Sequence, residues 1–307
     1  MTPRRPARRG ELRVAVTGAT GWLGRAACEV LAGEPGVKIE AFASRERTLT
    51  LDSGAVLDVQ PLRALPETAH DVLLHYAYLT REHVESYGLE AYVSANAAIT
   101  ATVASALERN RPSAILHASS GAAASGESDL RADPYAVLKR LDERTLRDGA
   151  RDVGARCVTL RVYNVAGPWI TKRGFAIRDL IEQVGAGGPV RIRASHPVRR
   201  SYVDVEDLAA LALAVTTAED LDADLRLDTA GDEVVEVGEL ARRVADVLGR
   251  PEARIERDVS AGAPPDDYIG DGTRLHEIAQ ALGLTLRDLD QQIRRTNEYL
   301  INHREAR

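Results

Sequence analysis

The sequence of 307 residues has only two cysteines and no apolar run long enough to form a membrane-spanning helix. Cys28 and Cys157 each lie in an apolar segment, so we expect two buried thiols rather than a disulfide or a metal pair. A membrane span needs about 18 consecutive apolar residues, and we therefore expect a cytoplasmic protein. Cysteine, histidine and carboxylate residues do not follow the spacing of a zinc or iron site, so we expect no metal.

Charge of one sign is also scarce. The net charge is −6, and the body of the chain has no long block of like charges, which argues against nucleic acid as the main partner. The exception is residues 1–10, where four arginines and two prolines predict a disordered basic leader. A hydrophobic fraction of 44% is ordinary for a globular protein that buries a core.

The first half of the chain alternates short apolar runs with longer helical patterns. Nearly continuous apolar strands separated by helices predict an α/β fold, with a doubly wound parallel sheet covered on both faces. We expect strands at 12–17, 37–43, 55–59, 72–76, 114–118 and 157–162, and helices at 22–31, 90–108 and 135–147. After Gly167, glycine and proline become frequent and the elements shorten. We expect residues 168–307 to form mainly a smaller substrate-binding lobe, partly interleaved with the first domain.

A glycine motif, Gly18-Ala19-Thr20-Gly21-Trp22-Leu23-Gly24, follows the first strand and opens the first helix. Gly18 permits a tight turn, Gly21 lets the backbone approach a pyrophosphate, and Gly24 lets the helix pack against the sheet. Free N–H groups at the start of the helix then hold the phosphates. Residues 11–167 are therefore predicted to be a dinucleotide-binding Rossmann domain. Its predicted cofactor-binding residues in this turn are Gly18, Thr20, Gly21, Trp22, Leu23 and Gly24.

The end of the second strand bears on the choice of cofactor. No acidic residue follows the apolar run directly; the next residues are Ser44, Arg45 and Glu46. A hydroxyl and a guanidinium suit a ribose 2′-phosphate, so we favour NADP(H). NAD(H) is the alternative, in which Glu46 or another group meets the ribose. Asp58 and Val59, after the third strand, are candidate neighbours of the adenine.

Tyr135 and Lys139 lie one helical turn apart, on one helix face. A free tyrosine has a pKa of about 10, and a nearby ammonium together with a positive nicotinamide ring favours its phenolate. The pair is therefore a candidate for acid–base catalysis. Ser120, with Ser119 as the second choice, ends the fifth strand where ligands of parallel sheets bind. Either hydroxyl is a candidate partner of the substrate oxygen, and the alternative is that both serines only form a turn.

Together these motifs resemble the extended short-chain dehydrogenase/reductase family, in its nucleotide-sugar epimerase, dehydratase and ketoreductase branch. The resemblance runs over nearly the whole chain. It includes the glycine turn, Tyr135 and Lys139 with Glu143, and the segments 71–77, 161–168 and 200–207.

The resemblance implies further roles. Lys139 is expected to hold the nicotinamide ribose as well as to assist Tyr135, and Ser120 to position the substrate hydroxyl or ketone. Family members are often dimers through the tyrosine-bearing helix, so we expect a homodimer to which Leu138, Leu141 and Leu146 contribute. The other residues implied by the resemblance are Tyr76, Ala77 and Asn96 for the cofactor, and Asn164 and Arg200 for a nucleoside-diphosphate sugar.

The sequence also departs from the family pattern. Dehydratases of this branch carry Asp-Glu after the serine, whereas Gly121 and Ala122 stand here and cannot do that proton chemistry. An arginine expected to meet the diphosphate is not evident around residues 264–267.

We therefore expect an NADPH-dependent ketoreductase that acts on a nucleotide-linked deoxysugar, with Tyr135 as proton donor. An NAD-dependent nucleotide-sugar epimerase is the alternative; the missing acid after the second strand favours the reductase, because family epimerases usually hold NAD. A non-catalytic dinucleotide-binding sensor is the alternative of another class. We would expect a sensor to have lost Tyr135 or Lys139, and both are present.

Overall fold

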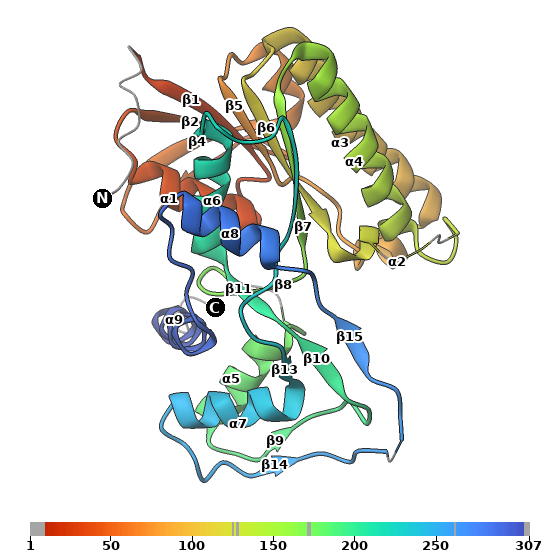
Figure 1. Ribbon diagram of the computed structural model, residues 1–307, viewed down its shortest axis with the longest axis vertical. Helices are drawn as coiled ribbons and strands as arrows, with labels where there is room; N and C mark the ends of the chain where they lie inside the picture. The colour runs from red at the N-terminus through yellow and green to blue at the C-terminus, as the bar shows by residue number, and fades with distance from the viewer. Residues whose placement is uncertain (1–9, 125, 127–128, 171–172, 261, 304–307) are drawn as a thin grey trace. The chain divides into compact units, whose positions relative to one another are not determined.

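The computed structural model describes residues 10–124, 126, 129–170, 173–260 and 262–303. They divide into two compact units (Figure 1). The first unit takes the chain up to Val162 together with Ala209–Leu227, and the second takes Tyr163–Leu208 and the chain from Asp228 onward. The predicted basic leader, 1–10, lies outside the described residues except for Gly10. The functional division predicted at Gly167 stays a prediction.

The first unit is built on an eight-stranded sheet with the order β12-β7-β6-β5-β1-β2-β4-β3. Neighbouring strands from β7 to β4 pair in parallel, so the predicted doubly wound α/β fold is confirmed. Its strands are β1 (Leu12–Thr17), β2 (Val37–Ala43), β3 (Arg47–Thr50), β4 (Val56–Pro61), β5 (Val72–His75), β6 (Ala114–Ser120), β7 (Arg156–Val162) and β12 (Asp224–Asp228).

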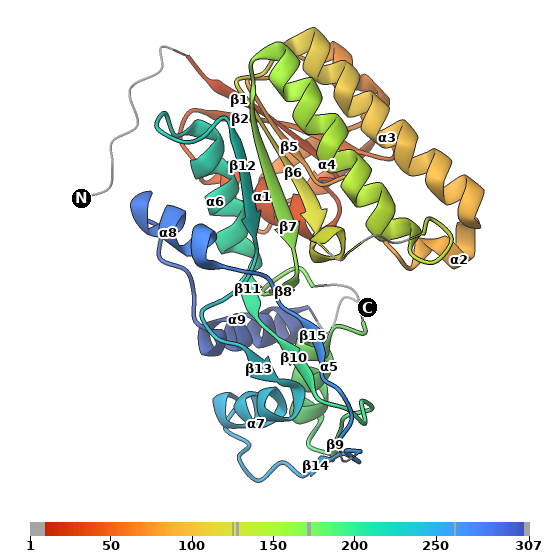
Figure 2. The ribbon, with the colours of Figure 1, turned by 45° about the vertical axis from the view of Figure 1, so that its right-hand side comes forward.

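Helices cover both faces of this sheet (Figure 2). α3 (Leu89–Asn110) and α4 (Pro134–Val153) lie on one face, and α1 (Trp22–Ala32) lies on the other. The strands are buried on both sides, which explains their nearly continuous apolar sequences. A core cluster joins the sheet to α3 and α4, and it includes Ala15, Phe42, Leu73, Leu107 and Leu146. The shorter helical segments are η1 (Leu62–Glu67), α2 (His83–Tyr87) and η2 (Gly121–Ala124), and α6 (Val205–Thr217) passes from the second unit into the first.

The structure corrects the prediction at the β3 edge of the sheet. β3 was not expected, and it pairs with β4 in antiparallel orientation. β4 runs to Pro61, past the predicted strand end at Val59, so Asp58 and Val59 lie inside it and not after the strand as expected. Val59 is buried beside Ala41 of β2, whereas Asp58 is exposed. β3 was missed because it is a four-residue strand with mainly exposed side chains, which carries little of the apolar signal that identifies a buried strand.

The proposed interface leucines also need correction. Leu138 and Leu146 are buried within the first unit, 6% and 0% exposed, so the expectation that they serve a dimer contact is wrong. Leu141, on the same helix, is 48% exposed. The homodimer itself stays a prediction.

The second unit combines short strands with helices that pack on one another. β8 (Asn164–Ala166) pairs in parallel with β11 (Tyr202–Asp204). A three-stranded sheet has the order β13-β10-β15, and β9 pairs with β14. The remaining bounds are α5 (Ala176–Ala186), β9 (Val190–Arg191), β10 (Val198–Arg200), β13 (Val235–Glu236), α7 (Val237–Val247), β14 (Ile255–Glu256), β15 (Asp266–Tyr268), α8 (Thr273–Ala281) and α9 (Leu289–Asn302).

Cys28 and Cys157 are buried free thiols, so their predicted place in the core is confirmed. No helix within the described residues combines the length and the apolar character that a bilayer crossing requires. Within the same parts of the chain, no group of three or more histidine, cysteine or acidic residues is placed to hold a metal ion.

Candidate active site

The glycine turn lies at the carboxyl end of β1, and the backbone around it packs so closely that two of its positions have no room for a Cβ. Gly18 has a φ of 70°, and a Cβ there would lie 2.8 Å from the backbone nitrogen of Ala77. A Cβ on Gly24 would lie 2.1 Å from the carbonyl oxygen of Gly18, so α1 packs directly on the turn. Gly21 is the N-cap of α1, and the first helical turn has no acidic residue. The N–H groups and the positive end of the helix dipole at this exposed position suit a phosphate.

Thr17 connects this turn to the next strand, although the sequence analysis did not single it out. Its hydroxyl accepts hydrogen bonds from the backbone nitrogens of Tyr76 and Ala77, both at 3.2 Å. The same oxygen lies 2.7 Å from Nδ1 of His75. Burial, followed by the charge of Lys139, holds the pKa of His75 well below its usual value, so the ring is neutral at pH 7. Thr17 thus fixes the chain where it leaves β5.

Asn96 of α3 holds the same segment further along. Its side-chain oxygen accepts from the backbone nitrogen of Leu79 at 2.9 Å, and its amide donates to the carbonyl of Leu79 at 3.2 Å. Asn96 is 1% exposed, so this is a buried side chain with both polar ends paired. Its direct contact with a cofactor stays a prediction, and its observed role is to set the backbone of residues 76–79.

The end of β2 lies beside the glycine turn, because the backbone nitrogen of Ala19 donates to the carbonyl of Phe42 at 3.0 Å. Ser44 and Arg45 follow β2 directly and are exposed. Within the described part of the chain, Arg45 forms no ion pair with a carboxylate. The predicted ribose-phosphate contacts thus stand next to the predicted pyrophosphate site.

Tyr135 and Lys139 lie in the first turns of α4. Asp133 caps this helix by accepting from the backbone nitrogen of Ala136 at 3.1 Å, and Pro134 occupies its first turn. Tyr135 is half-buried, whereas Lys139 is only 6% exposed. The Lys139 ammonium donates to the carbonyl of Ala118 at 2.8 Å, which ties α4 to the carboxyl end of β6.

Tyr78, which the sequence analysis missed, lies between the two members of this pair. Its ring centroid is 3.4 Å from Nζ of Lys139 and 6.0 Å from the centroid of Tyr135, with an interplanar angle of 73°. Burial lowers the pKa of Lys139 to about 8, while Asp142 and Glu143 act in the opposite direction. Segment 76–79 therefore contacts the glycine turn at one end and the tyrosine–lysine pair at the other.

The two serines of β6 have different partners. The hydroxyl of Ser119 donates to Oε1 of Glu143 at 2.6 Å, and Arg161 donates to both oxygens of that carboxylate at 2.8 Å. Burial would raise the pKa of Glu143, but the hydrogen bonds from Arg161 and Ser119 keep the pKa below its usual value. Ser120 accepts from the backbone nitrogen of Ala122 at 3.2 Å. Since successive strand residues face opposite sides, only one of these hydroxyls is bound to the Glu143–Arg161 pair.

Asn164 and Arg200, the residues implied for the substrate, both lie in the second unit near Tyr268. The amide of Asn164 donates to the carbonyl of Tyr268 at 3.0 Å. The guanidinium of Arg200 lies 6.0 Å from the Tyr268 ring centroid, and it donates to a side-chain oxygen and to the carbonyl of Asp266, both at 2.8 Å. The ring of Tyr163 packs 4.8 Å from that of Tyr268. The structure therefore brings these two residues to Tyr268, Asn164 at its backbone carbonyl and Arg200 near its ring.

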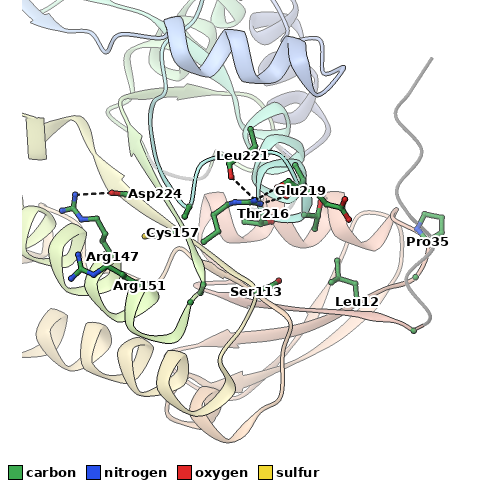
Figure 3. Close-up of a pocket in the computed structure, with 18 residues that line it drawn as sticks. Leu12, Pro35, Ser113, Arg147, Arg151, Cys157, Thr216, Glu219, Leu221 and Asp224 are labelled. Atoms are coloured by element: carbon green, nitrogen blue, oxygen red, sulfur yellow. Dashed lines mark hydrogen bonds and ion pairs between the residues drawn. The ribbon is translucent and has the colours of Figure 1, made fainter.

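A cavity of about 890 Å³ lies at the end of the first unit's sheet opposite the glycine turn, where the strands begin (Figure 3). It is lined by residues at the amino ends of strands, such as Leu12, Ser113 and Cys157, with Arg147 and Glu219 nearby. Ligands of open parallel sheets bind at the carboxyl ends of the strands, where the glycine turn and Ser120 lie. This cavity lies at the amino ends of the strands, so we do not assign it as the candidate active site.

The NAD dependent epimerase/dehydratase family matches residues 14–227 of the chain. That span contains the glycine turn, both serines and the tyrosine–lysine pair. The protein belongs to this family, and the predicted relationship is confirmed.

The chain also matches individual proteins, at low sequence identity. The chain is 30% identical over 148 residues to dTDP-4-dehydro-6-deoxy-D-allose reductase of Streptomyces bikiniensis, across 47% of this chain and 44% of that protein. The chain thus spans less than half the length of this curated relative.

Two solved structures share the fold. UDP-N-acetylglucosamine 4-epimerase from Methanobrevibacter ruminantium M1, in complex with UDP-N-acetylmuramic acid, matches with a TM-score of 0.77 and 19% identity, over 96% of this chain and 99% of that one. MoeE5 in complex with UDP-glucose and NAD matches with a TM-score of 0.73 and 21% identity, over 97% of this chain and 100% of that one. At these identities the likeness concerns the fold alone.

Proposed function

We propose that the protein is an NADPH-dependent ketoreductase that reduces the keto group of a nucleoside-diphosphate deoxysugar. The observation that carries this proposal is the continuous contact from Gly18 through Ala77 and Tyr78 to Lys139. This contact supports the proposal because it brings Tyr135, Lys139 and the glycine turn to the same end of the sheet. The S. bikiniensis relative, named as a reductase of a dTDP-linked keto-deoxysugar, supports the substrate class.

When bound, the reduced nicotinamide supplies the hydride that the keto carbon accepts. Tyr135 donates its phenolic proton to the carbonyl oxygen, so the product is an alcohol. The positive charge of Lys139 stabilises the phenolate left on Tyr135. Ser120 donates a hydrogen bond to the same substrate oxygen and orients it; Ser119 is less suited because its hydroxyl already donates to Glu143.

Replacing Tyr135 with phenylalanine tests the reductase. We expect NADPH consumption with a dTDP-4-keto-6-deoxysugar to fall by about 10²- to 10⁴-fold, the usual contribution of a positioned general acid. NADPH binding, followed by fluorescence, should change little because the ring is retained. Normal turnover by the variant would contradict the assignment of Tyr135 as proton donor.

The cofactor preference rests on Ser44 and Arg45, which are exposed directly after β2. Arg45→Ala should weaken NADPH binding far more than NADH binding, because only NADPH presents a 2′-phosphate to the guanidinium. Arg151→Ala, an exposed arginine at the opposite edge of the sheet, serves as control. Equal loss of both cofactors would contradict the NADP preference.

The NAD-dependent epimerase is the second candidate, since the family description itself names NAD and epimerases. An epimerase retains its cofactor and returns the hydride to the other face of the keto intermediate. NAD that is released from the purified protein only on denaturation would favour the epimerase over the reductase.

A further inference from the structure

Tyr78 touches both members of the tyrosine–lysine pair in different ways. The ammonium of Lys139 lies over the face of its ring, 3.4 Å from the centroid. The rings of Tyr78 and Tyr135 form a T-shaped pair, with a centroid distance of 6.0 Å. A cation over an aromatic face is attracted by the ring quadrupole, and edge-to-face packing fixes the relative orientation of two rings.

The backbone that carries Tyr78 is fixed on both sides. Thr17 accepts hydrogen bonds from Tyr76 and Ala77, and the Asn96 amide is bonded to both backbone polar groups of Leu79. A side chain mounted on such a segment has a defined position, unlike one on an open loop. The ring of Tyr78 is therefore placed before any ligand arrives.

Lys139 has lost most of its hydration, because it is 6% exposed. The carbonyl of Ala118 accepts from its ammonium, and the Tyr78 face lies against the same group. An ammonium removed from water keeps its proton only if such contacts replace part of the lost solvation.

The titratable groups that face Lys139 come from three elements. On α4, Asp142 and Glu143 raise the pKa of Lys139. On β5 and β6, His75 and His117 are buried, and burial lowers both of their pKa values. These histidines are neutral at pH 7 and do not compete with Lys139 for a charge.

We propose that Tyr78 is a positioning residue, whose ring face holds the Lys139 ammonium in its charged form while its T-shaped packing against Tyr135 orients that ring for proton transfer. This inference rests on the proposed reductase function. Tyr78 acts through its neighbours, and it requires no contact with the substrate.

The test compares Tyr78→Leu, which removes the aromatic face but keeps apolar bulk, with Tyr78→Phe, which keeps the face. The sequence has only three lysines, Lys38, Lys139 and Lys172. Selective ¹³Cε-lysine labelling therefore gives a simple NMR spectrum, in which Lys139→Arg assigns the signal. This titration needs no cofactor.

In the wild type we expect the Lys139 signal to titrate near pH 8. In Tyr78→Leu the acid dissociation constant should rise about fivefold to tenfold, so the midpoint moves to lower pH. Tyr78→Phe should stay within about twofold of the wild type. Tyr87→Leu, at a tyrosine that is 50% exposed in the same unit, is the matched control and should titrate as the wild type does.

Kinetics provide the second measurement. Tyr78→Leu should lower kcat about tenfold with little change in KM, and should move the acidic limb of the alcohol-oxidation pH profile to higher pH, because a less charged Lys139 stabilises the phenolate less. An unchanged Lys139 titration in Tyr78→Leu, or a Tyr78→Phe as impaired as Tyr78→Leu, would overturn the inference. If the titration shifts as expected but the wild type reduces no nucleotide sugar, the proposed function fails while the effect of Tyr78 on Lys139 stands.

Discussion

Replacing Glu143 with alanine removes the acceptor of three hydrogen bonds, two from Arg161 and one from Ser119. Both ionic partners are largely buried, with side-chain exposures of 5% for Glu143 and 15% for Arg161. In the variant the Arg161 guanidinium keeps its charge inside the unit but loses the Glu143 carboxylate that pairs with it. Such a charge is expensive because the protein interior solvates it poorly.

The expected loss is about 3–5 kcal/mol of the free energy of unfolding, the usual effect of removing one partner of a buried ion pair. A whole domain has a stability of only about 5–15 kcal/mol. Urea denaturation at pH 7, followed by circular dichroism, measures the difference. Asp148→Ala breaks the exposed pair with Arg151 and should cost less than about 1 kcal/mol.

A double variant, Glu143→Leu with Arg161→Met, separates the two contributions. Replacing both charges by apolar side chains of similar size should restore much of the stability lost in the single variant, because both members of the buried ion pair are then removed together. The reasoning would be refuted if Glu143→Ala lost no more than the exposed control, or if the double variant were less stable than the single one.

The Glu143–Arg161 pair also predicts how the free energy of unfolding depends on pH. The folded state holds the pKa of Glu143 below its usual value. Its contribution to stability is therefore fully present above about pH 4.3, the value in an unfolded chain, and is lost as the pH falls through the folded pKa. The stability difference between wild type and Glu143→Ala should accordingly shrink in acid.

Three further changes have defined outcomes. Gly24→Ala places a Cβ 2.1 Å from a carbonyl oxygen of the glycine turn, so NADPH affinity should drop more than tenfold in a fluorescence titration, whereas Gly33→Ala, whose Cβ meets its nearest atom at 3.5 Å, should bind normally. Asp266→Asn removes the carboxylate charge that pairs with the Arg200 guanidinium and should tighten dTDP binding about twofold to fivefold by calorimetry; weaker binding would mean that the carboxylate does not compete with the diphosphate. Because burial lowers the pKa of Lys139 to about 8, this side chain binds more protons in the unfolded than in the folded chain between pH 8 and about 10.4; the stability of the wild type relative to Lys139→Met should therefore rise over that range in urea unfolding.

The sheet was predictable where burial dominates. The bounds of β1 and β2 agree with the apolar runs, because both strands are covered by helices and end at polar or glycine residues. β3 escaped prediction, since an exposed edge strand needs only backbone pairing and its sequence, Arg47–Thr50, carries little apolar signal. β4 extends beyond the predicted end of its strand, to Pro61, so Asp58 and Val59 lie within the strand and not after it.

Only part of the candidate site could be predicted from the sequence. The positions of Tyr135 and Lys139 follow from helical spacing, which is a local property. Tyr78 has no such local signature, because its partners are 57 and 61 positions further along the chain. The hydrogen bond that distinguishes Ser119 from Ser120 likewise comes from another element and required the fold to be known.

The first unit consists of two separate stretches of chain, because Ala209–Leu227 returns to it after residues 163–208 have formed part of the second unit. That return delivers β12, the strand that flanks β7 at one border of the sheet, and the backbone nitrogen of Cys157 donates to the carbonyl of Ala223 there. A gene fragment that stops at Val162 would lack β12 and would leave the backbone amides and carbonyls along one side of β7 unpaired. Such an exposed strand promotes self-association through strand pairing. A fragment designed to contain the first unit alone should therefore include Ala209–Leu227.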